Sequence, residues 1–188
     1  MQKSYPQIKY KRYFCVPACI KAILTCKGLG RKIDIWTIGN ELDLKVPKGL
    51  SGEYPNTKIS KNNNFEINLH KKEHSINNFF KKYKLPLKEK RVYRTNKEKI
   101  IELLKNFKNS DIILCFDYPT IAQISDKKWG HVSLIVGFNE KSIFIQDPKS
   151  KNKIEINYNL LTKSIKKHGY KKRAGFWIIS KTKSKDLK

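Results

Sequence analysis

The chain has 188 residues, enough for one domain with a substantial hydrophobic core. Hydrophobic residues make up 39% of it, which excludes a disordered chain, and no apolar run approaches the roughly 18 residues of a membrane-spanning helix. The start, from residue 1 to residue 12, is polar and basic with no apolar stretch behind it, which excludes a secretory signal. We therefore expect a cytoplasmic protein with a single domain over 1–180 and a basic tail over 181–188.

The formal net charge of +25 indicates attraction to polyanions such as nucleic acid or an acidic membrane face. Of the 41 basic residues, 36 are Lys and 5 are Arg. Arg is the side chain most used to read bases, and it is scarce here. The composition therefore favours weak polyanion binding at low salt over specific nucleic-acid recognition.

Four cysteines are present, and Cys15, Cys19 and Cys26 fall within one short apolar stretch. Their spacing of one or two helical turns suits neither a disulfide framework nor a metal site, because the pair Cys15 and Cys19 lacks a matching second pair. We expect reduced thiols, no metal and no cofactor. Cys19, Cys26 and Cys115 are predicted to pack in the core, and His70, His74 and His168 to lie on the surface.

Helical patterns dominate the first part of the chain. Pro17 suits the first turn of a helix that carries Ile20, Ile23 and Leu24 and ends near Gly28. Three further helices have N-terminal signals, and a long loop, which could hold a short helical turn, is predicted between the second and third. These signals are Asp34, Ser75 and the capping-box pair Thr95 and Glu98, and the loop covers 46–68.

The pattern then changes to short apolar strands. They are predicted over 112–116, 131–138, 142–146, 154–156 and 176–179, with one short helix near 160–165. The polar turn 139–141 joins two of them into a hairpin. Helices followed by an antiparallel sheet predict an α+β fold, in which N-terminal helices pack on a C-terminal sheet.

Three residues could together perform nucleophilic catalysis. Cys15 lies at the start of the first helix, where unpaired N–H groups and the helix dipole stabilise a thiolate. His131 begins one strand of the hairpin and Asp147 follows the other, so the fold-back brings them side by side. Taken singly, each residue has an ordinary alternative: a buried structural cysteine, a strand-edge histidine and an Asp-Pro turn. Together they match the Cys-His-Asp relay of papain-like enzymes.

Three short segments, in two regions of the chain, resemble a known family. Cys15 to Leu24 resembles the nucleophile helix of the double-glycine-leader peptidases, which are the bacteriocin-processing domains of ABC exporters, and of their stand-alone papain-like relatives. The segments 130–137 and 145–148 resemble their histidine and Asp-Pro strands. The resemblance implies a papain-like fold, a peptide or protein substrate and Cys15 as the nucleophile. Val16 departs from the Gly that the family places after its cysteine.

The resemblance also implies a Gln a few residues before the nucleophile, as a donor to the oxyanion. Gln7 is the candidate, if the chain bulges over 9–14, and the backbone N–H of Cys15 would supply a second donor. Trp129 and Gly130 stand next to the histidine and are predicted to contact substrate; Trp129 could instead only cover the edge of the sheet. The site predicts a cysteine peptidase that cleaves a peptide or isopeptide bond through an acyl-enzyme. A papain-like acyltransferase and an inactive papain-like binding module are the alternatives.

Overall fold

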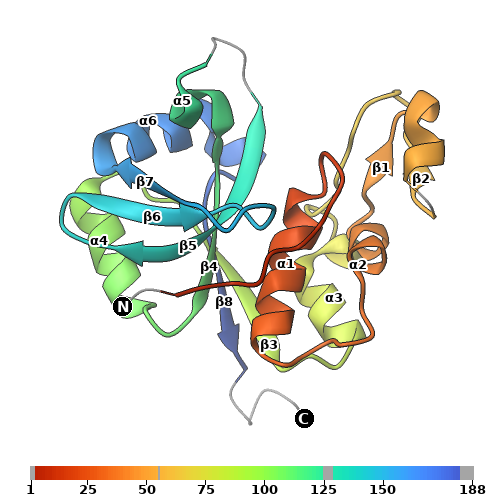
Figure 1. Cartoon of the computed structure of the whole chain (residues 1–188), viewed down its shortest axis with the longest axis horizontal. Helices are drawn as coiled ribbons and strands as arrows, with labels where there is room; N and C mark the ends of the chain where they lie inside the picture. The colour runs from red at the N-terminus through yellow and green to blue at the C-terminus, as the bar shows by residue number, and fades with distance from the viewer. Residues whose placement is uncertain (1–2, 55, 125–128, 183–188) are drawn as a thin grey trace.

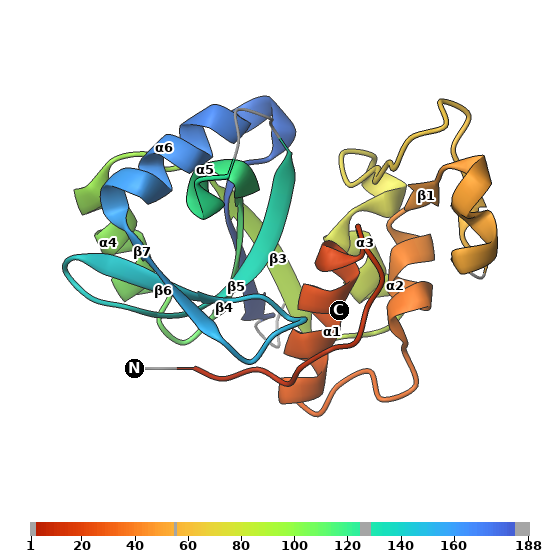
Figure 2. The same cartoon turned by 45° about the horizontal axis from the view of Figure 1, so that its top comes forward.

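A six-stranded antiparallel sheet forms the centre of the computed structural model, which describes residues 3–54, 56–124 and 129–182. Its strands are β3 (Leu87–Val92), β4 (Asp111–Asp117), β5 (Gly130–Phe138), β6 (Ser142–Gln146), β7 (Lys153–Asn157) and β8 (Gly175–Lys181). The order across the sheet is β3-β8-β4-β5-β6-β7. Helices cover both faces of the sheet (Figures 1 and 2).

One helical layer comes from the N-terminal part of the chain. It consists of α1 (Cys15–Cys26), α2 (Ile35–Glu41) and α3 (Ile76–Lys82). The connection between α2 and α3 holds short elements, namely β1 (Lys45–Val46), η1 (Lys48–Glu53), β2 (Lys58–Ile59) and η2 (Lys72–His74). This layer places the N-terminus of α1 beside β5 (Figure 1).

The other layer comes from helices inserted between strands. It consists of α4 (Lys97–Asn106), α5 (Tyr118–Ala122) and α6 (Tyr158–His168), and η3 (Tyr170–Lys172) follows α6. Every residue of β4 is buried, because the strand lies between the two layers. Ile113 and Cys115 face the N-terminal helices, and Ile112, Leu114 and Phe116 face α4 and α6. The alternating sides of the strand thus build two separate cores.

The α+β class and the packing of N-terminal helices on an antiparallel sheet are as predicted. The expected segregation of helices before strands is wrong in two respects. The sheet begins with β3, which precedes α4, and α4 and α6 cover the second face. The edge strand β3 was missed because residues 88–91 are all charged, so the sequence hides the alternation of buried Leu87 and Glu89 with exposed Lys88 and Lys90.

Helix caps follow the sequence closely. Asp34 accepts a hydrogen bond from the backbone of Thr37, and Ser75 caps α3 in the same way, as predicted. The predicted cap of α4 at Thr95 is wrong, because Asn96 accepts from the backbone N–H of Lys99 at 3.0 Å. Asn is as good an N-cap as Thr, so the choice between adjacent candidates depends on how the chain enters the helix.

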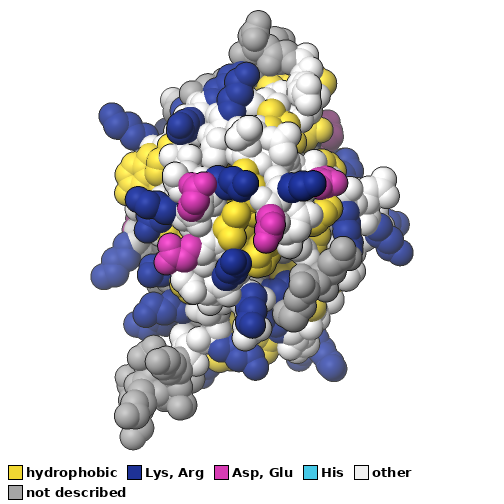
Figure 3. All heavy atoms as spheres, turned by 90° about the vertical axis from the view of Figure 1, so that its left-hand side faces the viewer, with side chains coloured by type: hydrophobic (Ala, Val, Ile, Leu, Met, Phe, Trp, Pro, Cys, Tyr) yellow, Lys and Arg dark blue, Asp and Glu magenta, His cyan; other side chains and the backbone are white. Residues whose placement is uncertain are grey.

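The predicted basic tail lies partly outside the described residues. Lys181 is the last residue of β8, and 183–188 are not described. None of the helices described is both long and apolar enough to cross a membrane. On the face shown in Figure 3, Lys and Arg side chains are spread widely with acidic residues among them, instead of gathering into one patch. Weak polyanion binding therefore stays a prediction.

Candidate active site

The hairpin of β5 and β6 brings His131 and Asp147 together. The strands pair in antiparallel register from Leu134 with Gln146 to Phe138 with Ile143, so the start of one strand lies beside the end of the other. The Nε2 atom of His131 lies 2.6 Å from Oδ2 of Asp147. Cys15 lines the same two pockets as His131, and its sulfur is close enough to the imidazole to raise the pKa of His131.

Cys15 comes from the opposite layer, as the first residue of α1. The N-cap residue Phe14 makes no side-chain cap, and Pro17 in the first turn has no N–H. The backbone N–H groups of Cys15 and Val16 belong to the first turn, where they have no partner within the helix. These groups and the helix dipole favour negative charge on Cys15 or on an oxygen bound beside it.

The electrostatics of His131 favour its protonated form. Burial by itself would lower the pKa of His131, but the Asp147 carboxylate and the Cys15 sulfur outweigh burial and raise that pKa to about 10. Burial would raise the pKa of Asp147, whereas the hydrogen bond with His131 and those from Lys149 and Tyr10 lower it. At neutral pH the pair is therefore an imidazolium held by a carboxylate.

Tyr10 is a member of this cluster that the sequence did not reveal. Its hydroxyl donates to Oδ1 of Asp147 at 3.0 Å, and the backbone N–H of Lys149 donates to the same oxygen at 2.8 Å. Both carboxylate oxygens are thus engaged, one by His131 and one by these two donors. Burial, followed by the nearby Asp147 charge, raises the pKa of Tyr10, so its hydroxyl remains a donor throughout the neutral range.

Aromatic side chains fix the plane of the imidazole. The rings of Phe116 and Tyr118 meet that of His131 edge to face, with centroids 5.7 and 5.4 Å away. Trp129 stacks on Tyr118 with centroids 6.0 Å apart, and it is 42% exposed. Trp129 therefore covers the outer side of the cluster and still presents a face to solvent.

Gly130 and His168 form a close contact beside the site. A Cβ atom on Gly130 would lie 2.4 Å from the His168 ring, so only glycine fits here. The prediction that His168 lies on the surface is wrong, because the residue is buried in the last turn of α6. The helical period would have revealed this, since Leu161, Ile165 and His168 share one face of α6.

Gln7 is not placed as the sequence predicts. Its side chain is exposed, and its Nε2 donates to the carbonyl of Lys149 at 2.7 Å. It lines neither of the two pockets that Cys15 lines. The reason is that the segment ahead of α1 is anchored to the hairpin, where the N–H of Ile8 donates to Pro148. As an oxyanion donor, Gln7 stays a prediction that would require this bond to change.

The other thiols differ from Cys15 in their surroundings. Cys19 and Cys115 are buried as expected, and burial raises the pKa of both, to about 12 for Cys115. The prediction that Cys26 packs in the core is wrong, because this residue is exposed at the end of α1. Cys15 is the cysteine that combines partial exposure with a charged partner.

Comparisons with known proteins agree with the fold. The chain matches the model of the Peptidase_C39 like family over residues 2–178. Among solved structures, it is similar to a candidate C39-like peptidase from Bacillus anthracis, with a TM-score of 0.60 and 14% identity over 96% of each chain. No curated protein matches. Because the family model spans nearly the whole chain, this protein belongs to the Peptidase_C39-like family.

Proposed function

We propose that this protein is a cysteine peptidase, with Cys15 as nucleophile, His131 as acid and base, and Asp147 as the group that orients the imidazole. The observation that carries this proposal is the 2.6 Å contact between His131 and Asp147 beside the sulfur of Cys15. A partly buried histidine with a raised pKa, paired with a carboxylate and facing a pocket beside a thiol, is the kind of group found at catalytic sites.

Catalysis begins with attack of the Cys15 thiolate on the carbonyl carbon of a peptide bond. The oxygen takes up the negative charge next to the first-turn N–H groups of α1, which stabilise it as an oxyanion. His131 then gives its proton to the nitrogen of the departing amine as the C–N bond breaks. This leaves an acyl-enzyme thioester and a neutral imidazole.

The second half of the reaction returns the site to its starting state. The neutral imidazole takes a proton from water, and the hydroxide formed attacks the thioester carbonyl. The C–S bond breaks, the acid is released, and His131 and Cys15 recover the imidazolium and thiolate. An amine in place of water gives acyl transfer by the same steps, so the acceptor decides between the two activities.

Rapid alkylation of Cys15 at low pH tests whether Cys15 and His131 form a thiolate–imidazolium pair, and it needs no substrate. A thiol in an ordinary peptide, with a pKa of about 8.5, is only about 0.3% thiolate at pH 6. We expect iodoacetamide to label Cys15 at pH 6 about 100-fold faster than exposed Cys26, as measured by peptide mass spectrometry. In His131→Ala the difference between the two cysteines should shrink to within a few fold. Equal labelling of both residues in the wild type would favour an inactive binding module.

Tyr10 is a positioning residue in this scheme, because it acts on the substrate only through Asp147. In Tyr10→Phe the ring stays and one donor to the carboxylate is lost, so the pKa of Asp147 rises. We expect kcat to fall about 10-fold, the worth of one hydrogen bond to a charged group.

The pH profile distinguishes this role from a structural one. Asp147 has a lowered pKa and supports activity above that pKa, so raising the pKa moves the acid limb of kcat/KM to higher pH. Suppose that Tyr10→Phe has the same kcat as the wild type and that the acid limb of its kcat/KM profile lies at the same pH. Tyr10 would then have no positioning role in catalysis.

A further inference from the structure

Two hollows meet at Cys15, which lines both of them. The smaller pocket has a volume of about 220 Å³ and the larger about 660 Å³, and both are lined by Tyr13, Cys15, Gly130 and His131. A peptide whose scissile bond lies on the thiol would therefore extend into both. The smaller pocket is below the size of typical small-molecule sites, so it suits a single side chain.

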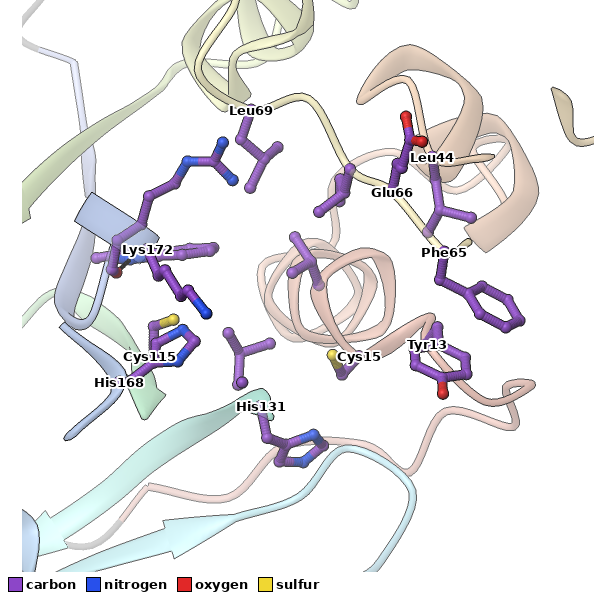
Figure 4. Close-up of a pocket in the computed structure, with 16 residues that line it drawn as sticks. Tyr13, Cys15, Leu44, Phe65, Glu66, Leu69, Cys115, His131, His168 and Lys172 are labelled. Atoms are coloured by element: carbon purple, nitrogen blue, oxygen red, sulfur yellow. Dashed lines mark hydrogen bonds between the residues drawn. The ribbon is translucent and has the colours of Figure 1, made fainter. Parts of the chain in front are cut away.

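The smaller pocket has apolar walls and a cationic side. Figure 4 shows Lys172 and His168 on one side of it, Tyr13 and Phe65 on the other, and Cys15 between them. Arg173 follows Lys172 and also lines the pocket. The apolar wall is formed by Val16, Leu44, Ile67, Leu69, Val132 and Trp177.

The described acid near these two cations, Glu89, is engaged by another residue. Glu89 is paired with Arg91, whose guanidinium lies 4.8 Å from the centre of the Trp177 ring. Within the described parts of the chain, neither Lys172 nor Arg173 forms an ion pair. The Nη2 of Arg173 donates to Nδ1 of His70 at 2.9 Å, a bond that supplies no negative charge.

Glu66 is the acid that lines the pocket among the residues that the structure describes, and its carboxylate is engaged away from the two cations. Glu66 accepts hydrogen bonds from Ser60 at 2.6 Å and Asn62 at 3.0 Å, and Figure 4 places it across the pocket from Lys172. Burial lowers the pKa of Arg173, and the nearby Arg91 charge acts in the same direction. A partly buried guanidinium without a carboxylate gains more from binding an anion than an exposed one does.

We propose that the smaller pocket selects peptide substrates with an acidic side chain, whose carboxylate binds Arg173 and Lys172 while its methylene groups contact the apolar wall. This inference rests on the proposed peptidase function, and it names the substrate class of that site. Arg is well suited to the role, because its planar fork can bind both oxygens of a carboxylate.

The experiment compares the cleavage of acidic and neutral peptides by the wild type and by pocket variants. A proteome-derived peptide library is first digested with the wild type, and the residues around new termini are read by mass spectrometry. The best-cleaved peptide is then made with Glu, and with Gln, at the selected position. We expect the wild type to prefer the Glu peptide by about 10- to 100-fold in kcat/KM, the worth of one or two hydrogen bonds to a charged group. Arg173→Gln should reduce that preference about 10-fold or more.

Lys171→Gln is the matched control, because it removes the same charge two residues before Arg173 and Lys171 lines neither pocket at Cys15. It should retain the wild-type preference to within twofold. An equal loss in Lys171→Gln and Arg173→Gln would assign the preference to the overall charge of +25 and overturn the inference. Cleavage without any acidic preference would also overturn it, while leaving the peptidase function intact. Absence of cleavage in the wild type would instead count against the proposed function.

Discussion

Alanine in place of Cys15 or His131 is expected to lower kcat/KM for peptide cleavage by about 10⁴- to 10⁶-fold, to the background of the assay. Cys15→Ala removes the atom that forms the thioester. His131→Ala removes both the proton donor for the departing amine and the cation that holds the thiolate. The two losses should not add in the double variant, because each one already abolishes the same covalent step.

The measurement follows the best-cleaved library peptide by mass spectrometry at pH 7. Cys26→Ala is the matched control, since Cys26 is an exposed thiol on the same helix as Cys15. It should retain activity to within twofold. Cleavage that survives in Cys15→Ala would assign the hydrolysis to another group and refute the proposed nucleophile. Addition of hydroxylamine tests for the acyl-enzyme that hydrolysis and acyl transfer share, because that intermediate then yields a hydroxamate.

Asp147→Ala is expected to lower kcat/KM by about 10³-fold or more, by analogy with the loss of the acid in other catalytic triads. The Nε2 of His131 would lose its 2.6 Å partner, and the ring could then turn away from Cys15. Asp147→Asn keeps an oxygen acceptor but removes the charge. It should therefore retain more activity than Asp147→Ala, which separates orientation of the ring from stabilisation of its charge.

The pH profile of Asp147→Asn provides a second readout. The pKa of His131, about 10, lies above the ordinary value, so the proton-donating imidazolium persists at neutral pH and is lost as the pH rises through 10. Without the carboxylate that pKa falls, and the alkaline limb of kcat/KM should move to lower pH. Profiles recorded from pH 6 to pH 10.5 measure the change. If the alkaline limb of kcat/KM lies at the same pH in the wild type and in Asp147→Asn, the Asp147 carboxylate is not the group that raises the pKa of His131.

The pairing of His131 with Asp147 could be predicted because it depends on one hairpin. The polar turn between two apolar strands specifies the fold-back, and the rest follows from strand geometry. Tyr10 could not be predicted in the same way, because 137 residues separate it from Asp147 and no local pattern marks the contact. The proposed role of Arg173 could not be predicted from the sequence either, because it depends on the nearby acid Glu89 being paired with Arg91.

The fold was predictable where burial follows a simple period. The apolar strands and the first helix were found because one face, or both, is consistently apolar. The strand β3 was not predicted, because it is an edge strand whose partner, β8, lies almost ninety residues further along the chain. Gln7 illustrates a different limit: the sequence spacing suggests a role, but a backbone contact from Ile8 to Pro148 sets where the residue points.

The two layers that form the site are synthesised at different times. Cys15 leaves the ribosome more than a hundred residues before His131 and Asp147, and the sheet that holds the latter pair includes β8, near the end of the described chain. Contacts this distant in sequence form late in folding. The nascent chain therefore carries its thiol without a base beside it until β8 has been synthesised and paired, and the proposed peptidase would be inactive up to that point. Under the proposed function, the need for the folded sheet would itself protect the chain from premature self-cleavage.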